Sequence, residues 1–234
     1  MTRAEKSKEY FDNTENYLGS NPVISLRKAI ICDLIGDQKN KQILDVGCGN
    51  GELTRDFIFN NYITFLDISQ NMLDLVKKSI SNDKLINAKF ENSDISLFKP
   101  DRKYDLVICV GVIAHVESVS GLLFKLNDIT SDKGNIILQF TANEKLLSQF
   151  NNMRYKFFRK KIYKYEVNRV STSKIEDLIS SLGIRIIKKV NHFPVSPFFS
   201  LFSYNKKLHL LYWSSKSHFL SYFGSETIFL LSKY

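Results

Sequence analysis

The segment QILDVGCGNG, residues 42–51, constrains the fold of this chain more than any other stretch. An apolar run that contains Asp45 ends at three glycines, Gly47, Gly49 and Gly51, which occupy every second position. In an open α/β sheet, ligands bind beyond the carboxyl ends of the strands, where the first strand turns into its helix. Glycines permit that tight turn and let a ligand lie against the backbone. The segment therefore predicts a buried strand followed by a binding loop.

The remainder of the chain alternates short apolar runs with helix-period stretches. The expected strands are QILDVG, YITFLDI, AKFENSD, YDLVICVG, GNIILQFTA, IRIIKKV and ETIFLLSKY, and the expected helices include ELTRDFIF, SQNMLDLVKKSI, VSGLLFKLNDI and TSKIEDLISSLG. Apolar strands separated by amphipathic helices predict a parallel sheet that is covered on both faces. The first 40 residues are expected to form helices, because a helix-starting Asn-Pro precedes the apolar run that ends at Gly36.

A single domain is expected for the 234 residues, a length that supports a substantial core. Its parts are a helical cap over residues 1–40, a core over 41–142, and a region over 143–234 that carries substrate-side helices, an insertion and the last two strands. The polar start of the chain lacks the apolar stretch of a signal peptide, and no window approaches the roughly 20 apolar residues of a membrane span. The three cysteines have no metal-ligand spacing. We therefore expect a cytoplasmic protein with free thiols and no metal site.

The positive charge is concentrated in the last third of the chain. Residues 151–234 hold fifteen Lys and Arg against four Asp and Glu, although the whole chain has a net charge of only +9. The stretch MRYKFFRKKIYKY mixes cations with aromatics, and residues 192–223 add a long aromatic-rich insertion before the last strand. A cationic, aromatic wall for an anionic substrate and a contact with anionic lipid headgroups both fit this composition. A solvated basic helix with an apolar cover over the sheet fits it equally well.

A second acidic residue restricts which class of ligand the loop can bind. Asp67 ends the next expected strand, twenty residues after Gly47, where a carboxylate could accept both hydroxyls of a ribose. The nicotinamide-dinucleotide fingerprint requires Gly or Ala at position 52, where this chain has Glu52, a poor neighbour for a pyrophosphate. Asp45, close before the glycines, suits a ligand that carries an amino group.

These residues resemble a known family. LDVGCGNGELT is similar to the first motif of class I S-adenosylmethionine-dependent methyltransferases, E/D-x-G-x-G-x-G, and the resemblance continues through FLDISQNML, ENSDI, YDLVICVGVIAHV and LNDITSDKGNIIL. It covers roughly residues 40–142 and is nearest to small-molecule methyltransferases of the ubiquinone and sugar types. The resemblance implies a Rossmann-like, doubly wound, mostly parallel seven-stranded sheet and S-adenosyl-L-methionine as cofactor.

The resemblance also implies roles for particular residues around the cofactor. The methionine end would be held by Asp45 and by the loop residues Gly47, Cys48, Gly49, Asn50 and Gly51. The ribose would bind Asp67, and the adenine would contact Ile68, Met72, Asp94 and Ile95. The sulfonium would lie near Val110 and Gly111, and the helices of the cap would fold over the cofactor with Tyr10, Tyr17 and Arg27.

His115 follows the fourth expected strand at the mouth of the site, and its ordinary pKa of about 6.5 suits a general base. The alternative is that His115 only packs or forms a hydrogen bond within its loop. The expected activity is methyl transfer to an oxygen or nitrogen of a small, anionic metabolite. An RNA methyltransferase and a cofactor-binding scaffold without catalysis are the alternatives. Nucleic acid is the less favoured substrate, because the chain lacks both the Asp/Asn-Pro-Pro-aromatic motif and the Pro-Cys or Thr-Cys nucleophile of nucleic acid methyltransferases.

Overall fold

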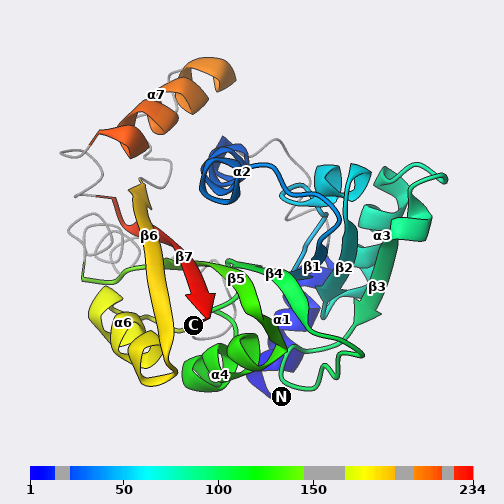
Figure 1. Cartoon of the computed structure of the whole chain (residues 1–234), viewed down its shortest axis with the longest axis horizontal. Coiled ribbons are helices and arrows are strands. Elements are labelled where there is room, and N and C mark those ends of the chain that lie inside the picture. The colour runs from blue at the N-terminus through cyan, green and yellow to red at the C-terminus, as the bar shows by residue number, and fades with distance from the viewer. Residues whose placement is uncertain (14–21, 145–166, 193–202, 218–223, 234) are drawn as a thin grey trace.

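A seven-stranded sheet forms the centre of the computed structural model, which describes residues 1–13, 22–144, 167–192, 203–217 and 224–233 (Figure 1). Its strands are β1 (Gln42–Val46), β2 (Tyr62–Asp67), β3 (Ala88–Asn92), β4 (Tyr104–Val110), β5 (Thr130–Thr141), β6 (Ile184–His192) and β7 (Glu226–Lys233). The strand order is β3-β2-β1-β4-β5-β7-β6. Neighbouring strands are parallel except that β7 runs antiparallel to β5 and β6. The predicted doubly wound, mostly parallel sheet is confirmed.

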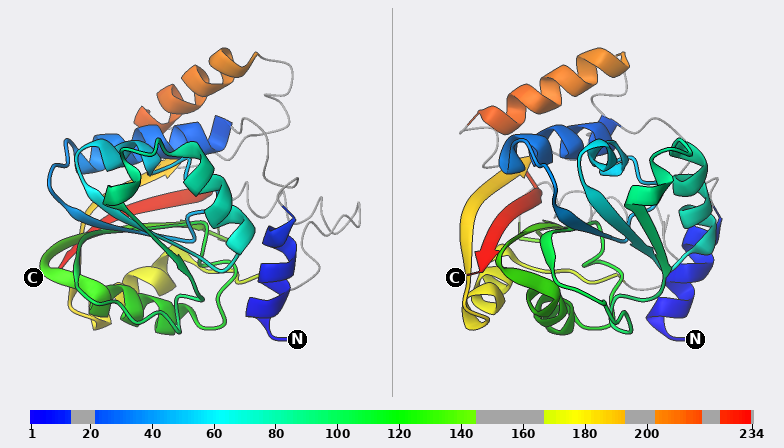
Figure 2. Two further views of the ribbon diagram at one scale, coloured as in Figure 1. Left: turned by 90° about the vertical axis from the view of Figure 1, so that its right-hand side faces the viewer. Right: turned by 45° about the vertical axis from the view of Figure 1, so that its right-hand side comes forward.

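Helices cover both faces of this sheet. They are α1 (Arg3–Asp12), α2 (Pro22–Ile35), α3 (Gln70–Ser79), α4 (Val119–Ile129), α6 (Thr172–Ser181) and α7 (Tyr204–Lys216), with short 3-10 turns η2 (Arg55–Phe59) and η3 (Leu85–Asn87). Figure 2 shows α2, α3 and α7 on one side of the sheet and α4 and α6 on the other, while α1 stands apart along one edge. The apolar residues follow this division, since one core cluster joins the sheet to α4 and α6 and a second joins it to α2, α3 and α7.

Strand alternation places polar side chains on the α2 side of the sheet at its carboxyl edge. Successive side chains of a strand point to opposite faces. Ile43, Phe65, Ile137 and Ile228 belong to the core cluster under α2. The residues two positions away toward the carboxyl edge therefore face the same side, and these are Asp45, Asp67, Gln139 and Glu226. All four are buried.

The helix expected over ELTRDFIF is wrong. The chain instead makes turns after Gly51 and a single 3-10 turn, η2. The side chain of Thr54 is drawn to the sheet by a hydrogen bond to Asp45, and the Asn61 amide donates to the carbonyls of Phe57 and Gln38. Because of these contacts the helical structure ends after one turn. The stretch therefore does not form an α-helix despite its apolar periodicity.

Much of the basic and aromatic region lies outside the described residues. The stretch MRYKFFRKKIYKY falls entirely there, and of the insertion before the last strand the structure describes α7 and its flanks. Leu211 of α7 packs into the core cluster that holds α2, and Tyr212 and Lys216 both bind the carboxylate of Asp33 at the end of α2. Across the described ranges, no helix combines the length and the apolar character that a bilayer crossing requires.

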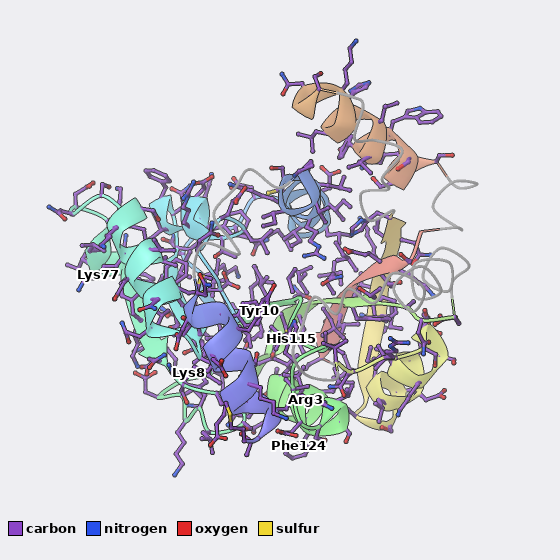
Figure 3. All side chains as sticks on the ribbon, turned by 180° about the vertical axis from the view of Figure 1, so that it is seen from behind. Arg3, Lys8, Tyr10, Lys77, His115 and Phe124 are labelled. Atoms are coloured by element: carbon purple, nitrogen blue, oxygen red, sulfur yellow. The ribbon has the colours of Figure 1, made fainter. Side chains whose placement is uncertain are left out.

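The burial of the side chains predicts a large difference in the free energy of unfolding between two phenylalanine truncations. Phe229 in β7 is fully buried, with its ring centroid 5.4 Å from that of Phe140, whereas Phe124 on α4 is 65% exposed (Figure 3). Phe229→Ala leaves a cavity and should lower the free energy of unfolding by about 3–5 kcal/mol. Phe124→Ala should change it by no more than about 0.5 kcal/mol. Urea unfolding of both variants measures this, and equal effects would contradict the assigned core.

Candidate active site

The loop after β1 is shaped by glycines in the left-handed region. Gly47, Gly49 and Gly51 have φ values of 66°, 53° and 72°, which side chains rarely tolerate. A Cβ at Gly47 would lie 2.6 Å from Cγ2 of Val112, and one at Gly51 would lie 2.9 Å from Cγ1 of Val76. The loop is therefore wedged between the turn after β4 and helix α3, and its backbone forms the surface there.

Asp67 joins this loop to the end of β2. One carboxylate oxygen accepts a hydrogen bond from the Gly49 amide at 2.9 Å, and the other accepts one from the Ser69 amide at 2.9 Å. Only 7% of the residue is exposed. Burial raises the pKa of Asp67, while the Ser69 and Gly49 amides act in the opposite direction. The carboxylate thus lies at the carboxyl end of β2 beside the glycine loop. Its binding of a ribose stays a prediction.

Asp45 is the second carboxylate of the site. It is 1% exposed and accepts a hydrogen bond of 2.5 Å from the Thr54 hydroxyl. Burial, with a smaller contribution from the charge of Asp67, raises the pKa of Asp45 to about 7, although the Thr54 hydrogen bond opposes the rise. A cationic group placed beside Asp45 would lower this pKa, because a nearby opposite charge favours the ionised form.

The residues expected around an adenine gather where β2 and β3 end. Met72 is buried in the first turn of α3, Ile95 is 6% exposed and Ile68 is half-buried. Asp94 accepts hydrogen bonds from the amide and hydroxyl of Ser96 through one oxygen, at 2.7 and 2.5 Å. Asp94 therefore also closes its own turn.

The end of β4 supplies the turn expected near the sulfonium. Val110 is buried, and Gly111 has a φ of 78°. The Gly111 amide donates a hydrogen bond of 2.8 Å to Oε1 of Gln139 on β5.

Helix α1 crosses the carboxyl edge between the two halves of the sheet. At its start, the Arg3 guanidinium donates to the Val116 carbonyl at 2.7 Å and to Oδ1 of Asn168 at 2.5 Å. At its end, Asp12 accepts a hydrogen bond of 2.7 Å from the hydroxyl of Ser69. Figure 3 shows the helix with Arg3 near one end and Tyr10 near the other. The predicted helical cap thus includes a helix anchored on both sides of the glycine loop.

His115 lies under this helix, with its ring 5.2 Å from that of Phe11 in an edge-on arrangement. Burial, together with the charge of Arg3, lowers the pKa of His115 to about 4. The imidazole therefore does not have the ordinary pKa on which the general-base prediction rested, and it is neutral at pH 7. The general-base role itself stays a prediction.

Comparisons with known proteins agree with this geometry. A family model described as a methyltransferase domain matches residues 37–190. A ubiquinone biosynthesis O-methyltransferase of Rickettsia bellii is 31% identical over 103 residues, which cover 44% of this chain and 42% of that protein. A demethylmenaquinone methyltransferase of Tropheryma whipplei is 23% identical over 54% of this chain and 53% of that protein. The structure of magnesium protoporphyrin IX methyltransferase of Synechocystis, with bound S-adenosylhomocysteine, superposes with a TM-score of 0.69 at 16% identity over both whole chains.

The chain belongs to the class I S-adenosylmethionine-dependent methyltransferases. The matched regions cover only about two-fifths to one-half of the length of these curated relatives. The likeness to the Synechocystis enzyme at 16% identity shows the fold alone.

Within this methyltransferase fold, the structure brings most of the predicted site residues to one edge. Gly49 donates to Asp67 directly, Thr54 joins Asp45 to the carbonyl of Gly51, and Gly47 donates to the carbonyl of Leu66. Cys48 and Asn50 lie in the same loop. Burial raises the pKa of the Cys48 thiol well above its ordinary value, so that thiol stays protonated.

The three residues predicted to contact the cofactor from the cap do not lie together. The guanidinium of Arg27 binds Glu226 through Nε at 3.0 Å and Nη2 at 2.8 Å. Tyr10 packs edge-on against Phe11 with a centroid distance of 5.1 Å. Tyr17 lies outside the described residues. A role for these three residues in cofactor binding stays a prediction.

Some polar residues of the methyltransferase site were missed by the sequence analysis. They are Thr54, Ser69, Asn92, Gln139 and Glu226. Asn92 donates to the carbonyls of Asp67 and Ile68 and so ties β3 to the end of β2. Gln139 and Glu226 carried a signal, because each is a polar residue within or directly before an apolar strand run, IILQF and ETIFLL.

Asp45 should make the protein without cofactor less stable as the pH rises. The pKa of Asp45 is about 7 in the folded chain and ordinarily 3.8, so the folded state binds the extra proton and stability falls between about pH 4 and pH 7. The whole difference corresponds to about 4 kcal/mol, of which about 2.7 kcal/mol falls between pH 5 and pH 8. Asp45→Asn keeps the acceptor for Thr54 and should remove most of this loss. Urea unfolding at pH 5 and pH 8 measures it.

The control for this prediction is Asp132→Asn, since the Asp132 side chain is 97% exposed. This control should show the pH dependence of the wild type. A wild-type pH dependence in Asp45→Asn as well would contradict the assigned protonation of Asp45.

Proposed function

We propose that this chain transfers a methyl group from S-adenosyl-L-methionine to an oxygen or nitrogen of a small, anionic molecule. The observation that carries the proposal is the Asp67 carboxylate, which bridges the glycine loop and the start of α3 at the carboxyl edge of the sheet. In an open α/β sheet this is the ligand-binding edge.

The residues present fit this cofactor. The backbone at Gly47 and Gly49 leaves a surface without side chains, and Asp67 offers carboxylate oxygens for two hydroxyls. Asp45, buried without a cationic partner among the described residues, would pair with the amino group of the cofactor. When bound, S-adenosylmethionine supplies a methyl group on a sulfonium that is already activated for displacement. The remaining task of the chain is to align the acceptor and to exclude water.

Helix α1 supports the exclusion of water. Its contacts with Ser69 on one side and Val116 and Asn168 on the other hold it across the site. A closed, dry site favours a methyl donor that would otherwise be exposed to competing nucleophiles.

The low basicity of His115 bears on which acceptor the site can use. An imidazole with a pKa of about 4 is a weak base at pH 7, so it would remove a proton from a neutral alcohol poorly. An acceptor oxygen that is already anionic at neutral pH needs no such base. The acceptor class that suits this site is therefore an oxygen that is ionised at neutral pH, such as that of a carboxylate.

Removing the Asp67 carboxylate should weaken cofactor binding. A charge-assisted hydrogen-bond partner contributes about 1.5–3 kcal/mol, so Asp67→Ala should raise the Kd for S-adenosylhomocysteine by roughly ten- to a hundredfold. Isothermal titration calorimetry measures this, with the exposed Asp132→Ala as a control that should bind normally. Unchanged affinity in Asp67→Ala, or tighter binding of NADH than of S-adenosylhomocysteine, would overturn the proposal.

The RNA alternative rests on the excess positive charge of residues 151–234 and makes a separate prediction. With labelled S-adenosylmethionine, the wild type should label a small-molecule extract, and the yield should change by less than about threefold between 50 and 200 mM salt. RNA bound through several phosphates would instead lose about a thousandfold or more in affinity over this range. Labelling of total RNA with that salt dependence would replace the small acceptor by RNA.

A further inference from the structure

A chain of buried polar side chains connects the turn after β4 to helix α2. The Gly111 amide donates to Oε1 of Gln139 at 2.8 Å, and Nε2 of Gln139 donates to Oε2 of Glu226 at 3.3 Å. The same oxygen of Glu226 accepts both hydrogen bonds from Arg27 on α2. Four elements, β4, β5, β7 and α2, are thereby joined by side chains on one face of the sheet.

These hydrogen bonds can run in only one direction. Gln139 is 1% exposed and Glu226 is 6% exposed, so each unpaired polar atom would carry a desolvation cost. The amide of Gln139 must present its oxygen to the Gly111 N–H and therefore its nitrogen to Glu226. The reverse orientation would set two donors against each other at Gly111 and two acceptors against each other at Glu226.

Glu226, at the α2 end of this row of hydrogen bonds, is an ionised carboxylate. Burial alone would raise its pKa, but the charges of Arg27 and His192 outweigh burial and hold the pKa below its ordinary value. Among the described residues, the charged or titratable groups in contact with Glu226 are Arg27 from α2 and His192 from β6, whose Nε2 lies 3.4 Å from Oε2. The orientation of the Gln139 amide is thus fixed by an ion pair that water does not reach freely.

We propose that Gln139 is a positioning residue for methyl transfer, which holds the Gly111 turn in place and is itself oriented by the Arg27–Glu226 ion pair. The inference rests on the proposed function and on the family resemblance, which implies that the sulfonium lies near Gly111. Gly111 has a φ of 78°, and the hydrogen bond to Gln139 directs its N–H into the sheet. Displacement at a sulfonium depends on close alignment, and a misplacement of about 1 Å can cost a hundredfold in rate.

Two variants of Gln139 test the proposal. Gln139→Met preserves length but removes both hydrogen bonds, whereas Gln139→Glu can reproduce them only when it is protonated. A protonated Glu accepts from the Gly111 amide through its carbonyl oxygen and donates through its hydroxyl to Glu226. Above the pKa of the shared proton, two carboxylates would face each other and the arrangement would fail. Gln139→Glu should therefore behave like the wild type at low pH and like Gln139→Met at high pH.

The measurements are hydrogen exchange at the Gly111 amide in protein labelled with ¹⁵N-glycine and the Kd for S-adenosylhomocysteine. In Gln139→Met, Gly111 should exchange at least tenfold faster relative to Gly51, whose amide bonds to Cys48 in the same loop, and the Kd should rise about three- to tenfold. For Gln139→Glu, the ratio of its Kd to that of the wild type should grow from about one at pH 5.5 to the Gln139→Met value at pH 8.5. Taking this ratio cancels the titration of Asp45.

Thr227→Val is the matched control, because Thr227 is buried in β7 and its hydroxyl donates to Oδ1 of Asn191 on β6, whereas Gln139 bonds Gly111 and Glu226. It should leave both readouts at wild-type values. Unchanged exchange at Gly111 in Gln139→Met, or a Gln139→Glu ratio that does not vary with pH, would overturn the positioning role. Failure of the wild type to bind S-adenosylhomocysteine would instead overturn the proposed function, and the exchange comparison would still decide whether Gln139 holds the turn.

Discussion

The hydrogen bonds that Asp67 accepts from the amides of Gly49 and Ser69 hold the site together. The first bond fixes the glycine loop against the end of β2, and the second fixes the start of α3. Ser69 in turn donates its hydroxyl to Asp12, so the placement of α1 depends on the same point. One buried carboxylate thereby determines where the loop, a helix N-terminus and the covering helix lie relative to each other.

The buried carboxylates at the carboxyl edge of the sheet are of two kinds, those with an ion-pair partner in the described part of the chain and those without one. Glu226 is compensated by Arg27 and has a lowered pKa, as expected for a charge that serves structure. Asp45 and Asp67 form no ion pair among the described residues, and burial raises the pKa of both. A folded chain that retains uncompensated buried carboxylates lowers its own stability, and perturbed groups of this kind cluster at functional sites. The half of the edge over β1 and β2 therefore gains most from a cationic ligand.

The sheet and the cofactor loop could be predicted from the sequence because both depend on local patterns. Apolar runs gave the strands, and the spacing of Asp45, the glycines and Asp67 gave the loop. What failed depended on contacts between distant segments. The turn at Arg55–Phe59 replaced a helix because Thr54 reaches the sheet, and the low pKa of His115 results from burial under a helix more than 100 residues earlier. The pairing of Arg27 with Glu226 spans 199 positions and has no local signature.

The electrostatics of the edge also bear on the order of binding. When both are ionised, Asp45 and Asp67 present negative charge at the glycine loop, while the excess of positive charge is carried by residues 151–234. An anionic acceptor that arrived first would meet this negative field without compensation, because the burial of both carboxylates reduces screening by solvent. The cofactor carries a sulfonium and an ammonium against one carboxylate, so its net charge of +1 offsets part of the negative charge at the edge. The anionic acceptor proposed above would therefore bind more favourably after the cofactor, and the charge that attracts it would then include the sulfonium from which the methyl group leaves.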